Sequence, residues 1–112
     1  MAANIYIYCP SGRVGLARDD LEEELESFFD EAAEDCGAGS GKAGFNLDYE
    51  FADGEDVHAW ADRLKPYLAS LGVRQGTFFT VYPEGWEPGD RWRRVDVFGA
   101  DRWLTDAEQG LA

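Results

Sequence analysis

The chain has 112 residues, of which 23 are Asp or Glu and 10 are Lys or Arg, so its formal net charge is −13. This length fits one domain, and 45% hydrophobic with 14% aromatic residues is too apolar for a disordered chain. The acidity argues against nucleic acid as a partner, because phosphate binding relies on Lys and Arg. No apolar run reaches the roughly 20 residues of a membrane span, and the N-terminus lacks the basic residues of a secretory signal. We therefore expect a folded cytoplasmic domain.

The first third of the chain predicts a strand followed by an amphipathic helix. Residues 4–8 are mostly β-branched or aromatic and end shortly before Pro10, which is typical of a strand. Asp19 and Asp20 are candidate helix caps. The apolar residues that follow recur every three or four positions, as expected for a core-facing stripe: Leu21, Leu25, Phe28, Phe29, Ala32 and Ala33. The glycines that come next predict a flexible connection: Gly37, Gly39, Gly41 and Gly44.

The rest of the chain predicts a second helix between strands. Residues 45–51 alternate apolar and polar, which indicates a strand with one buried face. A helical stripe opens near Asp53 and ends before Gly72, and Pro66 inside it is expected to kink or divide the helix. Residues 77–82 and 92–98 predict two further strands joined by a long hairpin connection. Thr105 and Glu108 predict a short terminal turn or helix.

These elements predict a single α/β domain over residues 1–112, with an α+β arrangement as the alternative. The expected order is β-α-β-α-β-β, with a four-stranded mixed sheet and a C-terminal β-hairpin. The alternation in residues 45–51 favours packing of both helices mainly on one face, because a strand covered on both faces would be apolar throughout.

The negative charge is concentrated in the first half of the sequence. Residues 1–62 hold 16 acids and three bases, whereas residues 63–112 hold seven of each. Ten of the acids fall within residues 19–35, a stretch with no base. On one helix, acids spaced by four residues repel each other at a cost of ~0.2–0.5 kcal/mol per pair. An acid-rich or halophilic proteome is one explanation, and an electrostatic surface for a basic protein partner is the other.

We take the second explanation as the leading hypothesis: a non-catalytic module that binds a basic partner, like inhibitors or immunity proteins, or like mimics of nucleic acid. The acids expected to contact the partner are Glu26, Asp30, Glu31, Glu34 and Asp35. Aromatic residues on the outer face of the sheet could add to this surface, because Tyr and Trp are enriched in binding hot spots. The residues concerned are Tyr6, Tyr8 and Trp92. An alternative is a homodimer through the same aromatic face.

A thiol-dependent enzyme is the other alternative. Cys9 ends the first predicted strand and is followed by Pro10, and the order of elements resembles a thioredoxin-like core. That resemblance implies a reactive thiol at Cys9, although Gly12 stands where a second cysteine would complete the C-x-x-C motif. No metal or cofactor site is predicted. His58 is the only histidine, and the Gly39-x-Gly41-x-x-Gly44 run precedes a strand instead of following one.

Overall fold

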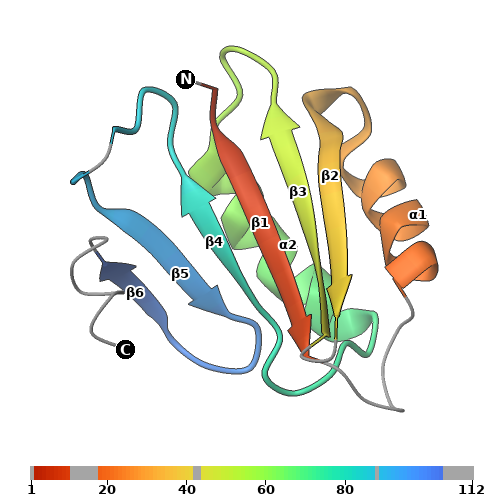
Figure 1. Cartoon of the computed structure of the whole chain (residues 1–112). Coiled ribbons are helices and arrows are strands. Elements are labelled where there is room, and N and C mark those ends of the chain that lie inside the picture. Colours follow the sequence, from red (N-terminus) through yellow and green to blue (C-terminus); the bar gives the residue numbers. More distant parts are fainter. Residues whose placement is uncertain (1, 11–17, 42–43, 88, 105–112) are drawn as a thin grey trace.

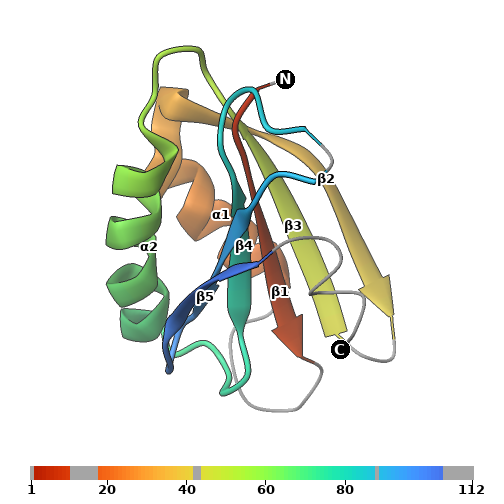
Figure 2. The same ribbon diagram turned by 90° about the vertical axis from the view of Figure 1, so that its left-hand side faces the viewer.

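In the computed structural model, one antiparallel sheet carries two helices on one of its faces (Figure 1). The structure describes residues 2–10, 18–41, 44–87 and 89–104. Seen from the side, both helices lie on the same side of the sheet (Figure 2). We call the opposite side, away from the helices, the open face. None of the helices in the described ranges is long and apolar enough to cross a membrane.

The sheet has six strands in the order β2-β3-β1-β4-β5-β6, and every neighbouring pair is antiparallel. Along the chain these strands are β1 (Asn4–Pro10), β2 (Ala33–Gly41), β3 (Gly44–Phe51), β4 (Phe78–Tyr82), β5 (Trp92–Asp96) and β6 (Asp101–Leu104). The first six main elements follow the β-α-β-β-α-β order of ferredoxin-like domains, and β5 and β6 extend that sheet on one side. Such an order of elements carries no information about activity.

The core lies between the sheet and the helices α1 (Arg18–Phe29) and α2 (Val57–Ser70). Side chains of the central strand alternate, so Ile5 and Ile7 point into the core while Tyr6 and Tyr8 point to the open face. The two helices are joined by an aromatic contact, in which the Phe28 ring stacks on Tyr67 with 4.3 Å between ring centroids. The buried residues of the helices are Leu21, Leu25, Phe29, Val57, Ala61, Leu64 and Leu68.

The predicted four-stranded mixed sheet and the predicted element order are wrong. The glycine-rich segment expected to be a flexible connection is strand β2, which pairs with β3 along its length. The chain also turns back after Val97 and adds β6 to the edge of the sheet. Glycine lowers strand propensity, but the ladder is made by backbone N–H and C=O groups that every glycine retains. With β2 beside β3 and β4 beside β1, the fold is α+β and antiparallel throughout.

The first helix is shorter than the sequence predicts. It ends at Phe29, because Asp30 has a left-handed backbone with φ 51°, and a 3-10 turn, η1 (Asp30–Ala32), leads into β2. The acids from residue 30 onward therefore do not continue the helix, so the repulsion between acids four residues apart is confined to those before Phe29, such as Glu22 and Glu26. A longer helix would have put further acids at the negative end of its dipole, an unfavourable arrangement that the turn avoids.

The second helix begins later than predicted and is not divided. Asp56 caps it, since one carboxylate oxygen accepts hydrogen bonds from the backbone N–H groups of His58 and Ala59. The helix continues through Pro66 to Ser70. Gly72, with φ 77°, follows its end as predicted. The predicted terminal turn at Thr105 and Glu108 lies outside the described residues.

The helix end at Asp30 can be tested by substitution. Because a β-branched residue is strained at φ 51°, Asp30→Val is expected to lower the free energy of unfolding by about 1–2 kcal/mol. Asp30→Gly should stay within about 0.5 kcal/mol of the parent, since glycine adopts this conformation freely. Denaturant unfolding of both variants measures the difference. If the helix instead continued through residue 30, glycine would be the more damaging replacement.

Candidate functional site

Exposed carboxylates gather around the β2 end of the sheet. They come from α1, from the turn η1, from β2 and β3, and from the loop after β3. We call this group the acidic edge, and its members are Glu26, Asp30, Glu31, Glu34, Asp35, Glu50 and Asp53, all exposed. In Figure 1, β2 is the last strand on one side of the sheet and α1 lies next to it. The five acids singled out in the sequence thus belong to one region, although they do not share a helix.

The acidic edge has carboxylates on both sides of the sheet. Glu34 lies opposite Glu50 in the β2–β3 ladder, and both belong to the open-face side. Asp35 lies opposite Tyr49, whose ring is in the core against Phe29, so Asp35 is on the helix side. This alternation follows from strand geometry, because neighbouring residues of a strand point to opposite faces.

A shallow pocket of about 320 Å³ opens at the acidic edge. Four carboxylates line it together with small and apolar groups: Ala2, Glu31, Ala33, Glu34, Glu50, Phe51, Ala52 and Asp53. The two segments that form its wall are tied together by the backbone N–H of Ala52, which donates to the carbonyl of Ala32 at 2.9 Å. Within the described ranges, no set of His, Cys, Asp and Glu is arranged to hold a metal ion. The chemistry of the lining suits the cationic end of a Lys or Arg side chain.

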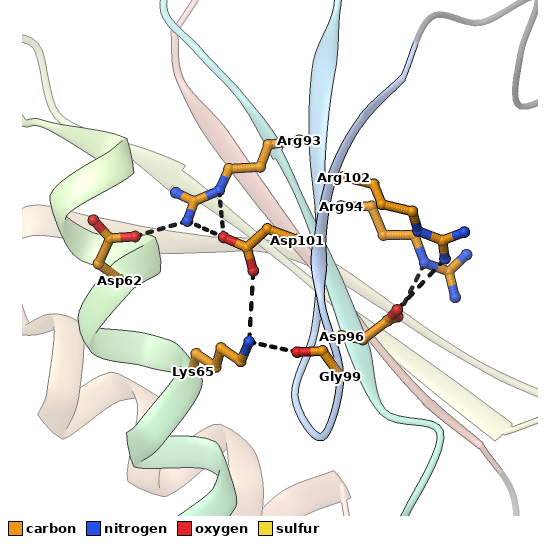
Figure 3. Close-up of polar contacts among 8 residues, drawn as sticks. All are labelled: Asp62, Lys65, Arg93, Arg94, Asp96, Gly99, Asp101 and Arg102. Carbon is orange, nitrogen blue, oxygen red and sulfur yellow. Dashed lines mark hydrogen bonds and ion pairs between the residues drawn. The ribbon is translucent and has the colours of Figure 1, made fainter.

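At the β5–β6 end of the sheet, acidic side chains form ion pairs with Lys and Arg of the same chain. Arg93 of β5 bridges Asp62 of α2, at 2.7 Å, and Asp101 of β6 (Figure 3). Lys65 lies 3.6 Å from Asp101 and donates a hydrogen bond to the Gly99 carbonyl at 2.6 Å. These contacts join the second helix to the last hairpin. The Arg93 side chain is mostly buried, whereas its partner Asp62 is exposed.

A second set of ion pairs lies on the open face of the same strands. Asp96 pairs with Arg94 at 3.1 Å and with Arg102 at 3.4 Å (Figure 3). The guanidinium of Arg94 also lies 3.8 Å from the centre of the Phe78 ring. Among residues 20–37, 44–87 and 89–104, every Lys and Arg belongs to α2 or to the chain after it. No ion pair within the described ranges involves Asp30, Glu31, Glu34 or Asp35.

The aromatic residues of the open face pack mainly against each other. The Tyr6 ring meets Tyr82 edge to face at 5.4 Å, and the Tyr8 ring stacks on Phe78 at 4.9 Å. Trp92 is on this face as expected from the pattern, but it is only 3% exposed and stacks on Tyr82. Trp92 is therefore too buried to contact a partner, whereas Tyr6 and Tyr8 are partly exposed.

The two thiols do not have the surroundings of reactive cysteines. Cys9 is buried in β1, and burial raises its pKa to about 11. Cys36 is exposed at a bulge in β2, where its Sγ donates to the Glu50 carboxylate at 3.5 Å. Partial burial and that carboxylate raise the pKa of Cys36 as well. The antiparallel sheet also lacks the element order on which the thioredoxin-like resemblance rested.

His58 has no hydrogen-bond partner for its buried ring nitrogen, Nδ1, in the structure. Its ring lies 5.3 Å from that of Trp103. Asp62, one turn away, pairs with Arg93 instead. The lone histidine is thus a packing residue at the α2–β6 contact.

Sequence reasoning missed Glu50 and Asp53 as members of the acidic edge. Glu50 was visible as a polar residue of the alternating strand, but only the β2–β3 pairing brings it opposite Glu34.

Neither a protein-family model, nor a curated protein, nor a solved structure matches this chain. Its function is therefore argued from the geometry of this surface.

The thiols provide a test of the site. Under native conditions iodoacetamide should label Cys36 about tenfold faster than Cys9, because Cys36 is exposed and Cys9 is buried. The labelling rate of Cys9 should rise with a midpoint near pH 11. Mass spectrometry of the labelled protein measures both rates, and Cys36→Ser is the control that isolates Cys9. A Cys9 midpoint below its ordinary value of 9.0 would restore the thiol-enzyme hypothesis.

Proposed function

We propose that the protein is a non-catalytic binding module for a partner with a positively charged surface, which it contacts through the acidic edge. The observation that supports this most is the separation of charge along the sheet. Within the described residues, exposed acids without an ion pair gather at the β2 end, while Asp62, Asp96 and Asp101 at the β5–β6 end pair with bases of their own chain. Inhibitors of basic enzymes and mimics of nucleic acid use the same electrostatic principle.

The crowding of these acids has a physical cost that binding would offset. Like charges held close together repel, and no basic side chain in the described ranges relieves Asp30, Glu31 or Glu34. At physiological ionic strength, charges within about 8 Å are only weakly screened from each other. A cationic group in the pocket would interact with several carboxylates at once, whereas scattered surface acids would act singly.

The alternatives have less support. General adaptation to an acid-rich proteome predicts acids spread over the surface, but here the second half of the chain is balanced in charge. A thiol-dependent enzyme needs a thiol with a low pKa, and burial raises that of Cys9 to about 11. Self-association through the open face would use aromatic rings that already pack on each other.

The proposal predicts that acids at this edge matter more for cation binding than equal charges elsewhere. The test uses an octalysine peptide and measures its association rate and affinity at low salt. The double variant Glu31→Gln with Glu34→Gln should lower the affinity about fivefold, equivalent to about 1 kcal/mol. The salt dependence of the association rate should also become flatter.

The matched control is Glu84→Gln with Glu87→Gln, in the loop between β4 and β5. Both residues are exposed, and the pair changes the net charge by the same amount. Its affinity for octalysine should stay within about twofold of the parent. If both double variants lower the affinity for octalysine equally, binding depends on net charge alone and the proposal fails.

A further inference from the structure

We propose that β2 binds an extended cationic segment of the partner by strand addition. This inference rests on the proposed function and specifies how its surface is used. Strand β2 ends the sheet, with β3 as its one neighbour in the described structure (Figure 1). The outer edge of such a strand presents backbone N–H and C=O groups that another extended chain can pair with.

The charges on the two faces of β2 determine which segment fits. An added strand would place alternate side chains on the two faces of the sheet. On the open-face side they would meet Glu34 and Glu50, and on the helix side they would meet Asp35 and Glu26. A segment with Lys or Arg at neighbouring positions would therefore find carboxylates on both faces. A second copy of β2 would bring like charges together, so the arrangement disfavours pairing between identical chains.

Gly37 follows the bulge in β2 and leaves room beside this edge of the sheet. A Cβ atom at this position would have no heavy atom within 4 Å, and Gly37 is not among the glycines with positive φ. Its backbone N–H donates to the Asp35 carboxylate at 2.9 Å, a bond that any residue except proline could make. Alanine would therefore fit the isolated protein. A glycine within a strand is typical of a place where another backbone approaches closely, which strand addition would require.

Tyr49 provides a second, independent observation. Its side chain is 1% exposed, and its hydroxyl has no hydrogen-bond partner in the structure. Burial raises the pKa of this hydroxyl, and the nearby carboxylates of Asp35, Glu22 and Glu26 raise it further. The hydroxyl is thus a buried polar group without a partner, near the carboxylates on the helix side of β2. A guanidinium or ammonium group of an added strand, held by Asp35, would supply the missing donor.

The bulge at Cys36 limits the length of the added strand. The β2–β3 register shifts between Asp35 and Gly37, so the edge is divided into two short stretches. The segment that fits is consequently a short one.

The experiment compares two peptides of identical charge. One is Val-Arg-Arg-Val-Arg-Arg-Val, and the other is the same sequence with N-methyl groups on alternate backbone nitrogens. N-methylation removes backbone donors, so the methylated peptide should bind about tenfold more weakly in isothermal titration. The unmethylated peptide should also slow amide hydrogen exchange within Ala33–Gly41.

Two variants test the residues that the proposal singles out. Gly37→Ala and Tyr49→Phe should leave the unfolding temperature unchanged or higher, because the fold requires neither the glycine nor the hydroxyl. Each variant should lower the affinity for the unmethylated peptide about fivefold. A loss of affinity with a stable fold is a result that a purely structural role would not produce.

The outcomes separate this inference from the proposed function. Equal affinity of the two peptides, with both still weakened by Glu31→Gln and Glu34→Gln, would overturn strand addition and leave the acidic binding surface in place. If the acid variant left both peptides unaffected, the binding surface itself would be wrong, and strand addition with it.

Discussion

The pairing of β2 with β3 is the interaction on which the surface of this protein depends. It converts a glycine-rich segment into the last strand of the sheet and places Glu34 opposite Glu50. Without it, the acids after α1 would lie on a connection of undefined shape. With it, they occupy fixed positions around one end of a six-stranded sheet. The ladder is made by backbone groups, so this order does not require the side chains that usually favour a strand.

The two ends of the sheet differ in how they handle charge. At the β5–β6 end, Arg93 holds an acid of α2 and an acid of β6 in the same contact. These ion pairs connect elements far apart in the sequence and contribute to the fold. At the β2 end, the acids of the described residues form no ion pair, so their contribution to stability is small or unfavourable. An arrangement that does not stabilise the fold is more easily understood as part of a binding surface.

Several features of the fold follow directly from the sequence. The alternation in residues 45–51 predicted one buried face of the sheet, and Leu47, Tyr49 and Phe51 are indeed in the core. The apolar stripe of the first helix correctly identified Leu21, Leu25 and Phe29 as buried. These predictions succeed because they depend on the period of apolar residues, which local geometry fixes.

The parts that could not be predicted depend on tertiary contacts. Nothing in the glycines of β2 indicates a strand, since the ladder with β3 determines it. The end of the first helix before Asp30 could not be predicted, because Ala32 and Ala33 continue the helical spacing of apolar residues. Both alanines are buried, but they lie after the end of the helix. The acids of the candidate surface were recognised by their density, but Glu50 and Asp53 are separated from them in sequence and join them only through the fold.

The separation of charge along the sheet has a consequence for the first moments of an encounter. With unpaired carboxylates at the β2 end and neutralised pairs at the β5–β6 end, the described part of the molecule carries an electric dipole moment along the sheet. An approaching cationic surface exerts a torque on that dipole and turns the β2 end toward itself. The protein would then be oriented before it touches the partner, and a larger fraction of collisions would occur in an orientation that allows binding.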